Sequence, residues 1–225
     1  MQYLILCPIC LLIAVVFIIV EKSGRYVAAD IIKGLASAVF VALGLLGVPG
    51  CSDPAFARMV VIGLVLGAVA DVLLNLRYVF EGNKAKLAFL AGIVVFLAGH
   101  ICYIIASLPY CPGIVPCVII GVVLTCALLY WIFQRIEAST VFKVFGFFYL
   151  GAIVILNCVA LFILVTSFSQ HWLVFFAGTL LFLVSDVILI LNNFGPKQSF
   201  AMRVSNLLLY YVGQLLIALS LQLPF

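Results

Sequence analysis

Residues 57–79 read ARMVVIGLVLGAVADVLLNLRYV, an apolar run that carries Asp71 and Asn75 inside it. A helix of about 20 apolar residues is long enough to cross the hydrocarbon core of a bilayer. Gly63, Gly67, Asp71 and Asn75 follow one another at four-residue steps, so they share one face of such a helix. Small residues on that face let a neighbouring helix approach closely. The stretch therefore predicts a membrane-spanning helix with a polar interior face.

The rest of the chain repeats this pattern. Its 225 residues are 68% apolar and 8% charged, far from the composition of soluble proteins. We predict one all-α domain over residues 1–225, a polytopic membrane bundle of eight transmembrane helices at about 3–20, 27–48, 57–79, 86–107, 114–134, 142–166, 171–193 and 203–223. This composition excludes a sizeable soluble domain and a DNA-binding module.

The basic residues indicate the orientation of the bundle. One set of alternate loops and helix ends holds Lys22, Arg25, Arg77, Lys84, Lys86, Arg135, Lys143, Lys197 and Arg203, whereas the opposite side holds only Arg58. Cytoplasmic loops of membrane proteins collect Lys and Arg. We therefore expect both termini to be non-cytoplasmic. The net charge of +4 follows from these loops, and no nucleic acid partner is expected.

Ionisable groups inside the predicted helices are the candidates for chemistry. A charged side chain at the centre of a membrane helix costs at least about 2.5–3.5 kcal/mol, so each one needs a partner or a function. Asp71 lies six residues before Arg77, Lys33 eight residues after Arg25, and Asp186 seven residues before Asn193. At 1.5 Å per residue, all three reach a similar depth in the cytoplasmic half. Tyr149 falls at a similar depth.

Polar residues on other helices extend this predicted interior site. His100 and Tyr103 share a stripe on the fourth segment, Tyr210 and Gln214 share one on the eighth, and Ser185 precedes Asp186. Each has a plainer interpretation: Lys33 with Asp71 as a structural ion pair, His100 as a hydrogen-bonded interior histidine, and Tyr210 as a packing residue. One lysine, however, cannot neutralise two carboxylates. Two carboxylates in one low-dielectric site favour an acid and a base from the same residue type.

Four motifs resemble the lysoplasmalogenase (YhhN-like) family of eight-helix membrane hydrolases. They are Gly67-Ala-Val-Ala-Asp71, Phe96-Leu-Ala-Gly-His100-Ile-Cys-Tyr103, Leu181-Phe-Leu-Val-Ser-Asp186 and Tyr210-Tyr-Val-Gly-Gln214-Leu-Leu-Ile217. The resemblance spans segments two to eight. Ala70 stands where this family usually has Gly, and Gly34 where it usually has Pro; neither change removes a reactive group.

The resemblance implies cleavage of the vinyl ether bond of lysoplasmalogens, which releases a fatty aldehyde and a glycerophospho-ethanolamine or -choline. It places the two catalytic aspartates at Asp71 and Asp186 and the lysine of the second segment at Lys33. A vinyl ether is labile to acid, which suits a protonated carboxyl group with a second group that activates water. Lys33 either binds the substrate phosphate or keeps one aspartate ionised. The candidate binding residues are Lys33, Asn75, His100, Tyr103, Tyr149, Ser185, Tyr210 and Gln214.

Several points stay open on the sequence. No cofactor or metal is expected, the expected partner is a lysophospholipid in the membrane, and a homodimer is left open. The main rival is a small-solute or ion transporter that uses Asp71, Asp186 and Lys33 as a relay. Cys51 and Cys111 fall in loops and could pair if these loops meet; the alternative is that they stay unpaired. The short loops favour a bacterial inner membrane.

Overall fold

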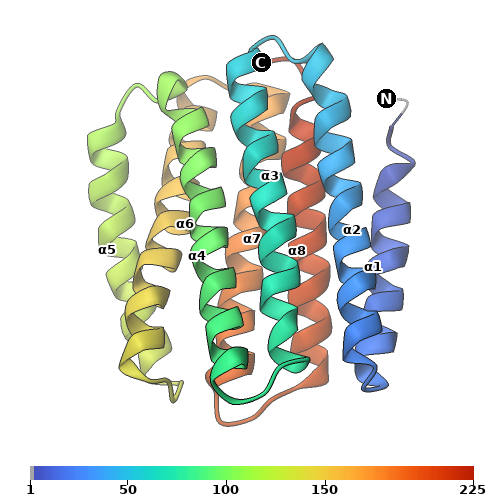
Figure 1. The fold of residues 1–225 in the computed structure, drawn as a ribbon. Helices are drawn as coiled ribbons and strands as arrows, with labels where there is room; N and C mark the ends of the chain where they lie inside the picture. Colours follow the sequence, from blue (N-terminus) through green and yellow to red (C-terminus); the bar gives the residue numbers. More distant parts are fainter. Residues whose placement is uncertain (1–2) are drawn as a thin grey trace.

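The computed structural model describes residues 3–225 as an all-helical bundle (Figure 1). It contains eight α-helices: α1 (Leu6–Lys22), α2 (Tyr26–Gly47), α3 (Pro54–Asn75), α4 (Gly82–Ser107), α5 (Ile114–Phe133), α6 (Thr140–Thr166), α7 (Gln170–Phe194) and α8 (Phe200–Ser220). Three short 3₁₀ turns, Val48–Gly50, Leu76–Tyr78 and Leu108–Tyr110, follow α2, α3 and α4. No strand is present among the described residues.

Seven of the helices, α2 to α8, are long and apolar enough to cross a membrane. The chain is therefore an integral multi-pass membrane protein. The first helix has 17 residues, at the lower limit for a crossing, and it packs against α2 and α8. Eight crossings and the orientation of the termini remain predictions.

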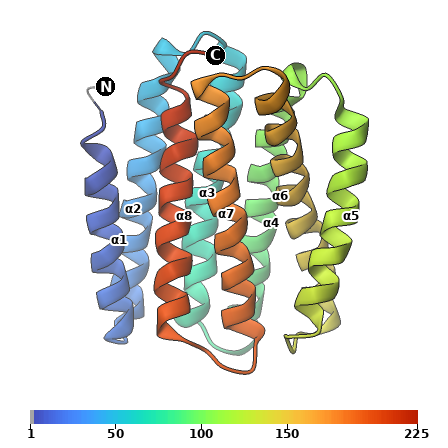
Figure 2. The ribbon, with the colours of Figure 1, turned by 180° about the vertical axis from the view of Figure 1, so that it is seen from behind.

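The helices run alternately up and down, so α1 begins and α8 ends at the same end of the bundle (Figures 1 and 2). The turns between α1 and α2, α3 and α4, α5 and α6, and α7 and α8 gather at the other end. We call this the basic end, because the nine basic residues counted above lie on or beside these turns.

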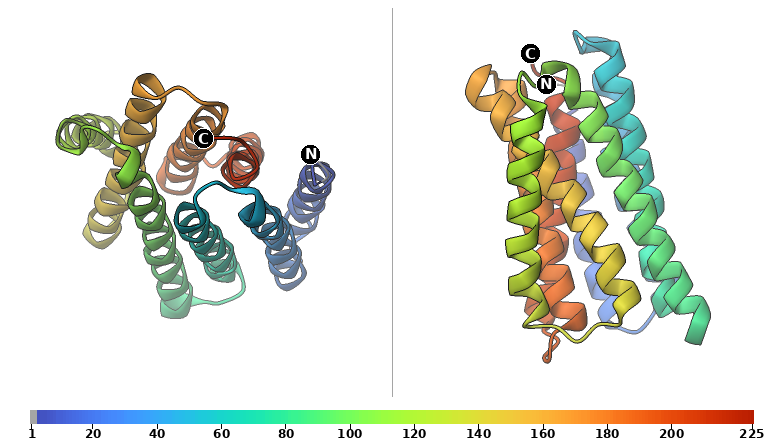
Figure 3. Two further views of the ribbon diagram at one scale, coloured as in Figure 1. Left: turned by 90° about the horizontal axis from the view of Figure 1, so that it is seen from above. Right: turned by 90° about the vertical axis from the view of Figure 1, so that its left-hand side faces the viewer.

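Four helices form the centre of the bundle. The pairs α3–α4 and α7–α8 have the most extensive contacts, α1 and α2 flank them on one side, and α5 and α6 on the other (Figure 3). Close packing depends on glycine where two backbones meet. A side chain at Gly178 or Gly213 would run into the facing backbone of α8 or α7, and one at Gly63 would collide with the Tyr103 ring.

The distribution of side chains is that of a membrane protein. Large apolar residues such as Ile19, Val123 and Val165 are exposed on the outside, where lipid would cover them. The predicted polar face of α3 is buried: Gly63, Gly67, Asp71 and Asn75 all point into the bundle. The polar stripes of α4 and α8 are buried as well.

Helix ends differ from the predicted ones where caps or polar residues extend a helix beyond its apolar run. The third helix begins at Pro54 because the Asp53 carboxylate accepts hydrogen bonds from the N–H groups of Ala55 and Phe56. Such a cap, followed by proline, is a strong start signal. The fourth helix begins at Gly82, four residues before the apolar run, because an exposed polar first turn precedes the hydrophobic part of the helix.

All eight cysteines are free thiols. A pair between Cys51 and Cys111, one of the two alternatives considered above, is therefore not formed. The Cys51 thiol instead contacts the backbone carbonyl of Asp53, and the Cys111 sulfur lies 3.9 Å from that of Cys117.

Candidate active site

A small polar cavity lies between α2, α3, α7 and α8. Its volume is about 30 Å³, room for one or two water molecules. Six of the ten predicted site residues line it: Lys33, Asp71, Asn75, Ser185, Asp186 and Tyr210. We call it the aspartate cavity. Three helices thus bring Lys33, Asp71 and Asp186 to one layer, as their depths along the helices predict.

The Asp71 carboxylate is held by three donors. The Lys33 Nζ lies 3.2 Å from Asp71 Oδ1 and 3.1 Å from the Asp71 carbonyl oxygen. The hydroxyl groups of Ser37 and Tyr210 each donate to Asp71 Oδ2 at 2.6 Å. Charge-assisted hydrogen bonds of this kind are the strongest available to a carboxylate. All of these side chains are buried, so Asp71 lies inside the bundle with a cation beside it.

Asp186 has a different environment. Its only hydrogen-bond donor among the described residues is Tyr149, whose hydroxyl lies 2.7 Å from Asp186 Oδ2. No lysine, arginine or histidine between residues 3 and 225 forms an ion pair with it. The residue is 3% exposed. Next to it, Ser185 accepts hydrogen bonds from the Asn206 amide at its carbonyl and hydroxyl oxygens, which fixes this turn of α7 against α8.

Two more predicted residues lie behind the cavity and support it. The Gln214 amide donates to the Tyr210 hydroxyl, and the Tyr103 hydroxyl donates to the Gln214 carbonyl oxygen, both at 3.3 Å. This series of hydrogen bonds ends at Asp71, because the Tyr210 hydroxyl donates to its carboxylate. Neither Tyr103 nor Gln214 lines the aspartate cavity, so both reach it only through Tyr210.

His100 also lies outside the cavity. Its imidazole is 1% exposed and is surrounded by the rings of Phe96, Tyr103, Tyr149 and Phe182. Neither ring nitrogen has a hydrogen-bond partner, so the interpretation of a hydrogen-bonded interior histidine does not describe it. Asn75, in contrast, faces the cavity, and both polar atoms of its amide lack a partner. These atoms are available to a ligand.

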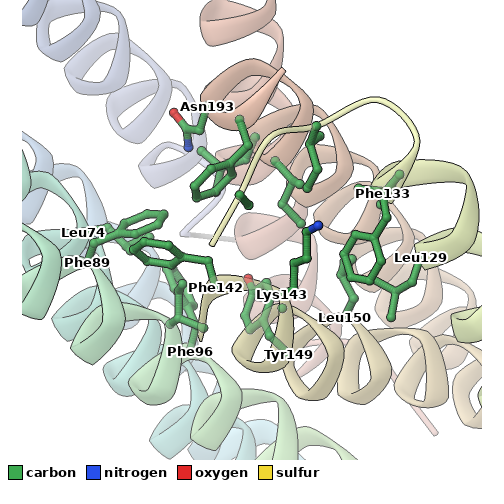
Figure 4. A pocket seen from close by; sticks show the side chains of 18 residues that line it. Leu74, Phe89, Phe96, Leu129, Phe133, Phe142, Lys143, Tyr149, Leu150 and Asn193 are labelled. Carbon is green, nitrogen blue, oxygen red and sulfur yellow. The ribbon is translucent and has the colours of Figure 1, made fainter. Parts of the chain in front are cut away.

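An apolar pocket adjoins the aspartate cavity. It has a volume of about 50 Å³, and Leu74, Phe96 and Leu189 line both spaces. Figure 4 shows aromatic rings around it, among them those of Phe89, Phe133 and Phe142. Tyr149 lines this pocket while its hydroxyl reaches Asp186. A molecule with an apolar chain and a polar centre would thus find both environments side by side.

Ser37 and Asn206 are not among the predicted site residues. Ser37 lies four residues after Lys33 on the same face of α2, and that spacing was the available signal. Arg77 and Arg203 also line the aspartate cavity, although their positions at helix ends identified them only as orientation signals. Among residues 3–225, no group of three or more His, Cys, Asp and Glu side chains is close enough to hold a metal ion.

This arrangement defines a class: polytopic helical membrane proteins with a polar site enclosed at the centre of the bundle. Residues 28–221 match the YhhN family. The chain therefore belongs to the YhhN family, which includes lysoplasmalogenases. No curated protein and no solved structure matches the chain.

Proposed function

We propose that this protein is a lysoplasmalogenase-like ether hydrolase, which cleaves the vinyl ether bond of a lysoplasmalogen to a fatty aldehyde and a glycerophospho-ethanolamine or -choline. The observation that carries the proposal is the pair of buried carboxylates on one cavity, of which only Asp71 has a cation beside it. The family match is consistent with a hydrolase. The neighbouring apolar pocket offers an apolar lining to the part of the alkenyl chain next to the ether bond.

The different partners of the two carboxylates support opposite roles for them. Asp71 has Lys33 and two hydroxyl donors, so it is the ionised partner that takes a proton from water. Asp186 has a single phenol donor and no cation, and burial disfavours an isolated charge. Asp186 is therefore the proton donor. Opposite roles for two neighbouring carboxyl groups are a known route to acid and base chemistry at neutral pH.

The reaction then proceeds in two balanced steps. Asp186 gives its proton to the outer vinyl carbon, and water attacks the resulting oxocarbenium carbon while Asp71 takes the proton of that water. The hemiacetal collapses in the second step. Asp71 returns a proton to the glycerol oxygen as the carbon–oxygen bond breaks, and Asp186 takes the hemiacetal hydroxyl proton. Both groups regain their starting states, and one water is consumed. The remaining residues orient these groups, and Asn75 offers a free amide to the substrate.

An isotope experiment with purified protein and a lysoplasmalogen tests this function. In D₂O, one deuterium should appear on the carbon next to the aldehyde; in H₂¹⁸O, the label should appear in the aldehyde oxygen and be absent from the glycerol hydroxyl. The product must be reduced at once to the alcohol and compared with an added aldehyde, because aldehydes exchange with water. Label in the glycerol product would exclude the mechanism. Recovery of intact lipid after reconstitution in vesicles would favour the transporter alternative.

A further inference from the structure

An open cleft lies at the basic end of the bundle, beside the turns that follow α1, α3 and α7. Its volume is about 590 Å³. Four basic side chains line it, Lys22, Arg77, Lys86 and Arg203, with one acidic side chain, Glu21. We call it the basic cleft. A concentration of one sign of charge in a concave surface attracts ligands of the opposite sign.

The two arginines of the cleft differ in their partners. Arg203 forms a two-point ion pair with Glu21, with nitrogen–oxygen distances of 2.6 and 3.0 Å, so its charge is already compensated. Arg77 forms no ion pair with any residue between 3 and 225. A partly buried cation without a counter-ion is costly to the fold. An anionic ligand would remove that cost.

Arg77 is also held in a fixed orientation. Its guanidinium carbon lies 4.6 Å from the ring centres of both Tyr78 and Phe89. Its Nη2 atom donates hydrogen bonds to the Tyr78 hydroxyl and to the side-chain oxygen Oδ1 of Asn193. The Arg77 Nε and the Asn193 Nδ2 are buried and have no hydrogen-bond partner. Two hydrogen-bond donors on neighbouring side chains, one of them charged, therefore lack an acceptor.

The basic cleft adjoins the spaces described above, because it shares lining residues with both of them. Arg77 and Arg203 line both the cleft and the aspartate cavity, and Asn193 lines both the cleft and the apolar pocket. Arg77 follows Asp71 by six residues, about 9 Å along the helix axis. A glycerol backbone has the right reach to connect an anion at Arg77 with an ether bond at the aspartates.

We propose that Arg77, assisted by Asn193, binds the phosphate diester of a lysophospholipid headgroup and so positions the ether bond at the aspartate cavity. The planar guanidinium fork matches the oxygens of a phosphate. Lys33 is the other candidate for this role. Its ammonium group already contacts Asp71, so Arg77 is the better placed cation for the phosphate. The inference rests on the proposed function for the nature of the lipid. Its binding test requires no turnover.

The test measures binding of lipids that this chemistry cannot cleave. The probes are a lysophosphatidylethanolamine with a saturated ether chain, the alkylglycerol of the same chain, glycerophosphoethanolamine, and inorganic phosphate. Wild-type protein should bind the phosphate-bearing lipid at least about tenfold more tightly than the alkylglycerol, since a hydrogen bond to a charged group is worth a factor of this size. Arg77→Gln should abolish this preference and leave alkylglycerol binding unchanged.

Arg135→Gln is the matched control. Arg135 lies at the same end of the bundle and also stacks on an aromatic ring, that of Trp131, but it does not line the cleft. This variant should keep the preference. Arg77→Lys should recover part of it, because it restores the charge without the fork. Should Arg77→Gln fail to fold, Asn193→Leu, which keeps the guanidinium, should reduce the preference by a smaller factor.

Three outcomes would overturn the inference: an unchanged preference in Arg77→Gln, an equal loss for both lipids, or inorganic phosphate bound as tightly as the phosphate-bearing lipid. The last result would assign the site to a free anion instead of a headgroup. The two proposals fail separately. Loss of the isotope labels in the hydrolysis experiment would leave the binding preference intact, and loss of the preference would leave the labels intact.

Discussion

Asp71 and Asp186 line one cavity, but the helices on its two sides provide them with different hydrogen-bond and ion-pair partners. On the α2–α3–α8 side, Asp71 receives an ammonium group and two hydroxyl groups. On the α6–α7 side, Asp186 receives one phenol. Both are almost fully buried, so exposure does not distinguish them. The two environments differ in hydrogen-bond and ion-pair partners and not in depth, and such partners favour or disfavour the charged form of a buried carboxyl group.

Removing either carboxyl group should have the largest effect. Asp71→Asn and Asp186→Asn should each lower turnover by at least about a hundredfold, because each removes one titrating group of an acid–base pair. The assay is aldehyde release from a lysoplasmalogen by purified protein. Asp53→Asn is the matched control, since Asn also caps helices well and Asp53 lies at the other end of α3. A variant of Asp71 or Asp186 with near-normal turnover would exclude the two-carboxylate mechanism.

Breaking the ion pair tests the Asp71 side alone. Lys33→Met should destabilise the protein by about 3–5 kcal/mol, the usual cost of leaving one partner of a buried pair unpaired. Turnover should fall as well, because the Asp71 carboxylate no longer has a cation beside it. Thermal unfolding in detergent and aldehyde release by purified protein measure the two effects.

The double variant Lys33→Met/Asp71→Asn provides the control for this experiment. It removes both charges, so it should be more stable than Lys33→Met alone while remaining inactive. If the single variant were as stable as wild type and had unchanged turnover, Lys33 would not act on Asp71, and the contrast between the two carboxylates would lose its basis.

The fold was largely predictable because the bilayer restricts the choices. Apolar runs about 20 residues long must be helices, so all eight segments were found. The burial of Asp71, His100, Asp186 and Gln214 followed from the cost of exposing them to lipid. Helix ends were less predictable, since the cap at Asp53 and the polar first turn of α4 lie outside the apolar runs.

The residues that form the site could be predicted from the sequence more easily than the contacts between them. Helical spacing places Lys33 and Asp71 at one depth, but it does not say which of two carboxylates the lysine contacts. That choice depends on how α2 packs against α3 and α8. Ser37 and Tyr210 meet at Asp71 through the same packing. His100 lies on the predicted face, yet aromatic rings separate it from the cavity, and periodicity carries no information on such shielding.

Removing the single donor of Asp186 tests the other side. Tyr149→Phe should lower turnover roughly threefold to tenfold, as expected for one lost hydrogen bond. The measurement is aldehyde release by purified protein. Turnover equal to that of wild type would show that the hydrogen bond from Tyr149 to Asp186 does not contribute to the reaction.

Tyr110 and Asp53 form a matched tyrosine–carboxylate pair outside the cavity, and they should give the smallest effect. The hydrogen bond from the Tyr110 hydroxyl, with those from the N–H groups of Phe56 and Ala55, lowers the pKa of Asp53 in the folded protein. A folded-state pKa below the unfolded value means that the stabilisation is present at neutral pH and is lost as pH falls through the folded-state pKa.

Tyr110→Phe should therefore lower the Tm at neutral pH by at most about 2–4 °C, because Asp53 is partly open to solvent and water screens the interaction. The Tm difference from wild type should shrink below about pH 4, with turnover unchanged throughout. A clear loss of turnover in Tyr110→Phe would show that loss of a tyrosine hydroxyl anywhere in the bundle affects activity, and the result for Tyr149 would then carry no information about Asp186.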